Sequence, residues 1–180
     1  MQPSLIQKYN VPGPRYTSYP TVPFWKKNEF KSKEWLEEMT HAFKLYPDSS
    51  IGIYIHLPFC ESLCTFCGCH KRITKNHAVE SPYIDALLSE WSLYLAHLPK
   101  NLHISELHFG GGTPTFFDPN ELLRLLRGIF GKEKIDPSEC DLSFEAHPNS
   151  TSVLHLQTLF DYGFRRVSFG IQVLKKFLQK

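Results

Sequence analysis

The sequence predicts an α/β fold, a partial (β/α) barrel of about four strand–helix units that follows an extended N-terminal arm and one helix. Short apolar runs alternate with amphipathic stretches four times, and strands that alternate with helices in this way pair in parallel. Each of the four apolar runs also places polar or very small side chains on one face. Strands of this kind suit the wall of a barrel whose lumen holds a polar ligand.

Residues 1–48 form the first predicted unit, an arm followed by a helix. The arm, residues 1–30, is rich in proline and aromatic side chains. Because proline lacks an N–H donor and disfavours helix, we expect this arm to be extended. The helix is predicted over Ser32–Tyr46, with Ser32 as its N-cap and apolar residues at helical spacing.

Residues 49–180 form the second predicted unit, the partial barrel. Its strands are expected at Ile51–Leu57, His103–Phe109, Asp141–Glu145 and Arg165–Ile171. In the first strand Ile53 and Ile55 share one face, whereas Tyr54 and His56 share the other. Buried parallel strands are usually apolar on both faces, so a polar face repeated in every strand indicates a cavity. An antiparallel sheet with one face exposed to solvent would show the same alternation of polar and apolar residues, but the helices between the strands argue against it.

Three helices are expected between and after these strands. They span about Ser81–His97, Pro119–Phe130 and Ser150 or Thr151 to Asp161. Ser81 and Asp118 are the predicted N-caps of the first two helices, and Gly131 is the predicted end of the second. The carboxyl ends of all four strands then meet at one edge, where we expect the functional site.

Four cysteines lie within ten residues directly after the first strand, at Cys60, Cys64, Cys67 and Cys69. Thiolates separated by such short gaps bind iron–sulfur clusters. Structural zinc is the main alternative, and zinc sites commonly combine two C-x2-C pairs. Only one such pair occurs here, because Cys140 stands alone. The spacing therefore favours an iron–sulfur cluster over zinc, redox or disulfide use.

Composition excludes several other classes of function. The net charge of +2 gives no electrostatic signature for binding nucleic acid or an anionic membrane surface. The first residues lack the apolar segment of a signal peptide, and no apolar run reaches the roughly 18 residues of a membrane span. Bunched cysteines fit a reducing compartment better than a disulfide framework. We therefore expect a cytoplasmic protein without nucleic-acid or membrane partners.

Four motifs in this order resemble those of the radical S-adenosylmethionine (SAM) enzymes, and specifically the oxygen-independent coproporphyrinogen III oxidases, also called coproporphyrinogen dehydrogenases. The motifs are RYTSYPT at Arg15–Thr21, CxxxCxxCxC at Cys60–Cys69, GGGTPT at Gly110–Thr115 and GIQ at Gly170–Gln172. The resemblance implies a barrel of the radical SAM type with a [4Fe–4S] cluster. Cys60, Cys64 and Cys67 would hold three irons and SAM the fourth, while Cys69 would stay off the cluster in a role that the resemblance leaves open.

The resemblance also implies a set of SAM contacts. These are Tyr54, Phe66, Gly111, Gly112, Thr113, Glu145 and Gln172. Strand alternation supports Tyr54 and Glu145, since both would face the lumen, and glycine after a strand would admit a ligand to the backbone. A simple flexible turn is the alternative for the glycines, and a surface acid is the alternative for Glu145.

The activity implied is oxidative decarboxylation of propionate side chains of coproporphyrinogen III to vinyl groups, giving protoporphyrinogen IX. It requires an electron donor, and the relatives hold a second SAM beside the first. A full eight-unit barrel takes about 250 residues, so we expect the first half of a barrel whose C-terminal half is missing or lies on a separate chain. Two alternatives stay open: a related haem-handling protein, and a non-catalytic fragment that binds an iron–sulfur cluster or zinc.

Overall fold

The computed structural model describes Asn10, Phe24 and residues 31–64 and 67–170, and the following account concerns these residues. The arm predicted for residues 1–30 therefore lies outside the described residues except at two positions. The chain divides into two compact units, residues 1–35 and 36–180, and the fold below belongs to the second. Helix α2 (Ser32–Leu45) ends one residue before the predicted limit.

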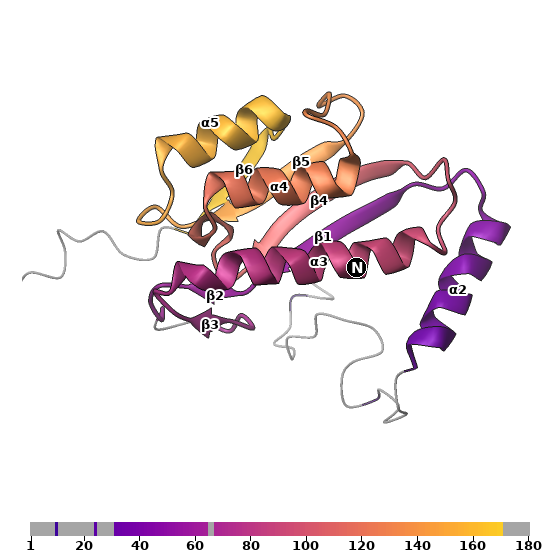
Figure 1. Cartoon of the computed structure of the whole chain (residues 1–180), viewed down its shortest axis with the longest axis horizontal. Helices are drawn as coiled ribbons and strands as arrows, with labels where there is room; N and C mark the ends of the chain where they lie inside the picture. The colour runs from indigo at the N-terminus through magenta and orange to yellow at the C-terminus, as the bar shows by residue number, and fades with distance from the viewer. Residues whose placement is uncertain (1–9, 11–23, 25–30, 65–66, 171–180) are drawn as a thin grey trace, which may run out of the picture. The chain divides into compact units, whose positions relative to one another are not determined.

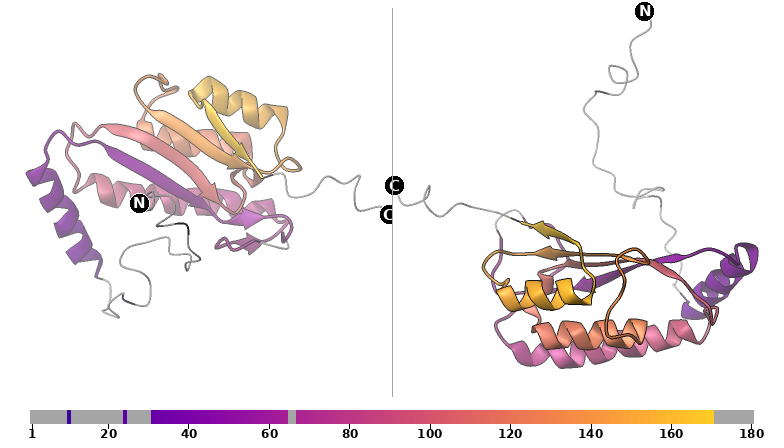
Figure 2. Two further views of the ribbon diagram at one scale, coloured as in Figure 1. Left: turned by 180° about the vertical axis from the view of Figure 1, so that it is seen from behind. Right: turned by 90° about the horizontal axis from the view of Figure 1, so that it is seen from above.

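A four-stranded parallel sheet forms the centre of the second unit (Figure 1). Its strands, in spatial order, are β1 (Ile51–Leu57), β4 (Ile104–Gly111), β5 (Asp141–Ala146) and β6 (Arg166–Phe169). Three helices connect successive strands and lie on one face of the sheet (Figure 2). They are α3 (Glu80–Leu95), α4 (Pro119–Phe130) and α5 (Val153–Tyr162). These four parallel strands lie side by side in the order in which they occur along the chain, and the three connecting helices cover one face. This is the arrangement of the wall of a (β/α) barrel, which confirms the predicted fold class.

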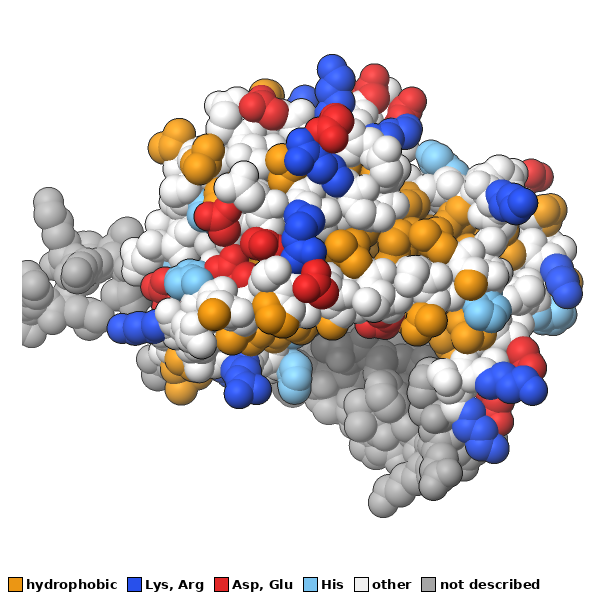
Figure 3. All heavy atoms as spheres, viewed as in Figure 1, with side chains coloured by type: hydrophobic (Ala, Val, Ile, Leu, Met, Phe, Trp, Pro, Cys, Tyr) orange, Lys and Arg blue, Asp and Glu red, His pale blue; other side chains and the backbone are white. Residues whose placement is uncertain are grey.

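The core lies between the sheet and these three helices. Alternate side chains of the strands, among them Leu57, Phe109 and Phe144, point toward it and are buried. Helix α4 supplies Leu122 and Leu126, both fully buried, because its apolar residues recur at three- and four-residue intervals. On the outer side of the helices, acidic and basic side chains mix along the seam between α3 and α4 (Figure 3).

The last described strand departs from this pattern. Val167 of β6 is 43% exposed and Phe169 is 41% exposed, although alternation along the strand predicts a buried apolar face. The reason is position, since β6 is the edge strand of the described sheet and pairs only with β5. Among the described helices, none combines the length and apolar character needed to cross a lipid bilayer.

Several boundaries differ from those predicted by one to three residues. Helix α3 begins at Glu80, one residue early, and follows a 3-10 turn, η2 (His77–Val79), so Ser81 is not its N-cap. Helix α5 begins at Val153 with Ser152 as its N-cap, and not at Ser150 or Thr151, whose hydroxyl groups donate to the carbonyl of His147. Strand β4 runs two residues further than predicted, because Gly110 and Gly111 still pair with β1.

Candidate functional site

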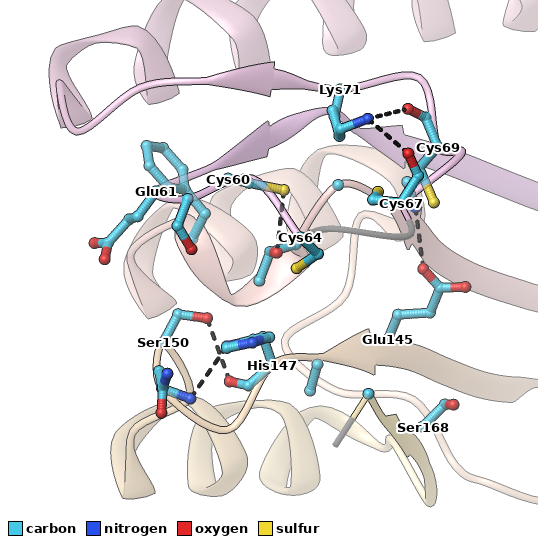
Figure 4. A pocket seen from close by; sticks show the side chains of 18 of the residues that line it. Cys60, Glu61, Cys64, Cys67, Cys69, Lys71, Glu145, His147, Ser150 and Ser168 are labelled. Atoms are coloured by element: carbon cyan, nitrogen blue, oxygen red, sulfur yellow. Dashed lines mark hydrogen bonds between the residues drawn. The ribbon is translucent and has the colours of Figure 1, made fainter. Parts of the chain in front are cut away.

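A cavity of about 520 Å³ opens at the carboxyl ends of the strands (Figure 4). The cysteine loop after β1 forms one wall, and the end of β5 with its following turn forms the opposite one. The glycine turn after β4 completes the lining. Of the residues singled out from the sequence, the structure brings together at this cavity Cys60, Cys64, Cys67, Cys69, Gly111, Gly112, Thr113 and Glu145.

The cysteine loop is closed at its base by a short parallel pair, β2 (Phe59–Cys60) and β3 (Arg72–Ile73). The backbone N–H of Arg72 donates to the Pro58 carbonyl at 2.8 Å, and that of Thr74 donates to the Cys60 carbonyl at 2.9 Å. Within the loop, the Lys71 ammonium donates to the carbonyls of Cys67 and Cys69 at 3.1 and 3.3 Å. The backbone that carries the thiols is therefore held at both ends and near its middle.

The thiols occupy different environments. Cys60 is buried with its Sγ 3.3 Å from the Thr113 hydroxyl, and burial raises its pKa. The backbone N–H of Cys69 lowers the pKa of the half-buried Cys67 by hydrogen bonding to its sulfur. Burial is the main cause that raises the pKa of Cys69. Cys140 is buried away from this loop, and burial raises its pKa to about 11.

The donor set fits an iron–sulfur cluster. Within residues 31–64 and 67–170, no three His, Cys, Asp or Glu side chains are arranged to hold a metal ion. A cluster with several irons differs from a single ion, because each thiolate binds a different iron and the sulfurs do not converge on one point. Soft thiolates on one short loop, facing one cavity, are ligands typical of such clusters.

The glycine turn is packed against the base of the cysteine loop. The N–H of Gly112 donates to the Leu57 carbonyl at 2.9 Å, and that of Thr113 donates to the Phe59 carbonyl at 3.0 Å. A Cβ on Gly112 would lie 2.6 Å from the carbonyl carbon and oxygen of Pro58 and 3.0 Å from the Cys60 sulfur. Glycine is thus required at 112 for contact with the chain's own loop, whatever ligand the turn also meets.

Glu145 is joined to the same turn. Its Oε2 accepts a hydrogen bond from the Gly111 N–H at 3.2 Å, and its Oε1 lies 3.9 Å from the His108 Nε2. His108 is held in turn by the Ser143 hydroxyl, 2.7 Å from its Nδ1. Glu145 is half-buried at the end of β5 and is not an isolated surface acid.

Tyr54 lies on the polar face of the sheet, as strand alternation predicts, but it does not line the cavity. Its ring stacks on His108, and its hydroxyl lies 3.2 Å from the His56 Nδ1. The His56 Nε2 donates to the His70 carbonyl at 2.7 Å, so the Nδ1 of the neutral ring accepts from Tyr54. The predicted contacts Phe66 and Gln172 lie outside the described residues.

Several residues that line the cavity were not predicted as site residues, among them Lys71 and His147. The Nδ1 of His147 accepts a hydrogen bond from the Asn149 N–H at 3.2 Å, and its carbonyl accepts from the N–H groups of Ser150 and Thr151. A basic residue two positions after the last of four cysteines was the available signal for Lys71.

Comparison with known proteins decides the family. Residues 54–180 match the model of the radical SAM superfamily. The oxygen-independent coproporphyrinogen III oxidase of Escherichia coli (strain K12) is 37% identical over 177 residues, which are 98% of this chain and 37% of that protein. The protein of the same name from Mannheimia haemolytica is 38% identical over 146 residues, 81% of this chain and 94% of that protein. The chain belongs to the oxygen-independent coproporphyrinogen III oxidase family of radical SAM proteins.

A solved structure of this family shares the fold. Coproporphyrinogen III oxidase (HemN) from Escherichia coli, described as a radical SAM enzyme, aligns with a TM-score of 0.77 at 33% identity. The alignment covers 91% of this chain and 36% of that protein. The chain thus spans a little over a third of the length of the Escherichia coli relative. Membership of the family confirms the resemblance drawn from the four sequence motifs.

Proposed function

We propose that this chain carries the cluster- and SAM-binding part of an oxygen-independent coproporphyrinogen III oxidase, which decarboxylates propionates of coproporphyrinogen III to vinyl groups. The observation that carries the proposal is the cavity itself. Three thiols at the spacing of the family motif, the glycine turn and Glu145 line one space at the carboxyl ends of parallel strands. This is where (β/α) barrels place their chemistry.

Cys60, Cys64 and Cys67 are the proposed ligands of a [4Fe–4S] cluster. When bound and reduced, the cluster supplies the electron that splits SAM homolytically. The hydrogen bond from the Cys69 N–H, together with the positive charge of Lys71, lowers the pKa of Cys67 and so favours its thiolate form. Burial raises the pKa of Cys60, and the Thr113 hydroxyl, 3.3 Å from its sulfur, and the charge of Lys71 oppose this shift. Cys69, exposed at the loop, is proposed to stay off the cluster.

The proposed SAM contacts are those that the family resemblance implies: Tyr54, Phe66, Gly111, Gly112, Thr113, Glu145 and Gln172. For Gly111 and Thr113 the support is their place on the cavity wall beside Cys60. Glu145 keeps acceptor capacity after bonding Gly111, so its carboxylate can also accept from a ligand. We further propose a cytoplasmic location, an electron-donor partner, and further barrel units, on this or another chain, that complete the wall begun by residues 49–180.

Metal analysis tests the proposal first. Anaerobically reconstituted chain is expected to hold about four iron and four sulfide per molecule, the content of a [4Fe–4S] cluster. Replacing Cys60, Cys64 or Cys67 by alanine should abolish cluster binding. Cys69→Ala and Cys140→Ala are the matched controls and should retain it. Tightly bound zinc without acid-labile sulfide would refute the proposal.

An activity assay separates the oxidase from a haem-handling relative. The reconstituted chain is supplied with SAM, a reductant and coproporphyrinogen III, with and without a C-terminal barrel half from a relative. Vinyl product together with SAM cleavage is expected only when the barrel is complete. SAM cleavage that does not depend on coproporphyrinogen III, together with haem binding, would instead support the haem-handling alternative.

A further inference from the structure

His77 lies between two carboxylates at the outer edge of the cysteine loop. Its Nδ1 is 2.5 Å from Oε1 of Glu80, and its Nε2 is 3.6 Å from Oε1 of Glu61. The imidazole also stacks on the Phe116 ring, with a centroid distance of 4.5 Å and an interplanar angle of 11°. Both ring nitrogens therefore face acceptors, which is the arrangement of an imidazolium.

Glu80 is the fixed end of this arrangement. It is 4% exposed, and its Oε2 accepts the backbone N–H of Asp118 at 2.6 Å. The carboxylate thereby joins the start of α3 to the start of α4. A buried carboxylate needs more than one partner to offset its loss of hydration. His77 supplies the second partner, and the hydrogen bond to Glu80 is the main cause that raises the pKa of His77.

Glu61 is the other end, and it directly follows Cys60 in the loop. A series of hydrogen bonds connects the base of the loop to the turn at His77. The Thr74 N–H donates to the Cys60 carbonyl at 2.9 Å, and the Asn76 N–H donates to the Thr74 hydroxyl at 3.0 Å. Asn76 then caps the turn that begins at His77.

The partners of His77 also belong to the proposed site. Glu61 and Phe116 both line the cavity, and Phe116 ends the short 3-10 helix η3 (Pro114–Phe116) that follows the glycine turn. A side chain that contacts both therefore joins the cysteine wall of the cavity to its glycine wall.

We propose that His77 is a positioning residue that holds the first turn of the cysteine loop, and with it Cys60, against the helix ends at Glu80. Its relevance to the cluster rests on the proposed function. The mechanism is electrostatic and geometric: one cation bridges a buried carboxylate on the scaffold and a half-exposed carboxylate on the loop. Loss of either contact releases Glu61 and increases the exposure of the adjacent thiol.

Site-resolved alkylation of the metal-free, reduced chain by iodoacetamide tests this inference. In His77→Gln and in Glu61→Gln, Cys60 should react about fivefold faster, as expected for loss of a half-exposed ion pair. The double variant should react no faster than either single variant, because both remove the same bridge. His77→Arg, which keeps the charge and several donors, should stay close to the unaltered rate.

Two references separate positioning from general damage. Cys140, buried away from the loop, should react at an unchanged rate in every variant. His97→Gln, at an exposed histidine just after α3, is the matched substitution and should leave Cys60 unaffected. Equal acceleration of Cys60 and Cys140, no acceleration, or additive effects in the double variant would overturn the inference. Cys60-specific acceleration in a chain that binds no cluster would keep it while refuting the proposed function.

Discussion

Gly112 lies where the backbone of the glycine turn passes the base of the cysteine loop. A methyl group at this position would lie 2.6 Å from the backbone carbonyl of Pro58. The two backbone segments cannot move apart independently, because the Gly112 N–H donates to the Leu57 carbonyl. Gly112→Ala is therefore expected to lower the free energy of unfolding by about 1–3 kcal/mol, the usual cost of overpacking. Urea unfolding followed by circular dichroism measures this change.

Gly68→Ala is the matched control, because a methyl group there would find no atom within 4 Å. It should leave the unfolding midpoint unchanged. Equal effects at both positions would mean that the loss arises from glycine's backbone freedom and not from the contact with Pro58.

Individual site residues differ in how far the sequence could place them. Glu145 was predicted from strand alternation, and it does line the cavity at a strand end. Tyr54 was predicted on the correct face, but it lies three residues before the carboxyl end of β1 and stacks on the ring of His108. Alternation along a strand specifies which face of the sheet a side chain lies on, but not how close it lies to the cavity at the strand end. The prediction for Tyr54 was therefore right about the face and incomplete about the distance from the cavity.

Helix α4 begins as its sequence predicts. Asp118 caps it, with Oδ1 accepting the Asn120 N–H at 2.8 Å, and Pro119 occupies the first turn. Asp118→Ala should therefore cost about 1 kcal/mol of stability, the typical value of an N-cap. Asp118→Asn retains the acceptor and should be nearly neutral. Thermal unfolding of the two variants compares them directly, and similar losses in both would contradict the capping role.

The other end of α4 depends on a residue distant in sequence. The Tyr162 hydroxyl, in a side chain that is 1% exposed, donates to the carbonyls of Leu126 and Lys132 at 3.1 and 3.0 Å. Burial raises the pKa of Tyr162 to about 12, so it stays a neutral donor at physiological pH.

Tyr162→Phe should destabilise the chain by about 1–3 kcal/mol, since it leaves carbonyls near the end of α4 without this donor. Tyr46→Phe, at a tyrosine that is 67% exposed, serves as the control and should be neutral. Chemical denaturation quantifies both, and an unchanged midpoint for Tyr162→Phe would show that water satisfies the two carbonyls.

The stability of the whole chain should depend on pH through His77. Its pKa is raised above the ordinary 6.5, chiefly by the hydrogen bond to Glu80. A raised pKa means that the folded state holds the proton more tightly than the unfolded state. The contribution of protonated His77 to the free energy of unfolding is therefore fully present below about pH 6.5 and is lost as the pH rises through the pKa of His77 in the folded state. The contribution should be modest, because His77 is half-exposed.

Comparison with His77→Gln isolates this contribution. The difference in unfolding free energy between the unaltered chain and the variant should shrink as pH rises from about 5.5 to about 8.5. Urea titrations at several pH values measure it. A difference that stays constant across this range would show that His77 does not change its protonation on unfolding.

Local patterns in the sequence were enough to predict the strand–helix alternation, the parallel sheet, the ends of α4 and the meeting of three motifs at the strand ends. Each of these depends on residue spacing or on the preferences of neighbouring residues, which are present before the chain folds. The family resemblance rests on the same local information, since its motifs are short and contiguous.

Other features required the folded chain. Helix α3 begins at the buried Glu80, before the predicted cap Ser81, and Gly112 packs against Pro58. The bridge from Glu61 through His77 to Glu80 arises in the same way. These contacts depend on the pairing of β1 with β4, the closure of β2 on β3 and the packing of α3 beside α4. Such long-range contacts leave no period or spacing in the sequence, because the partners are chosen by packing.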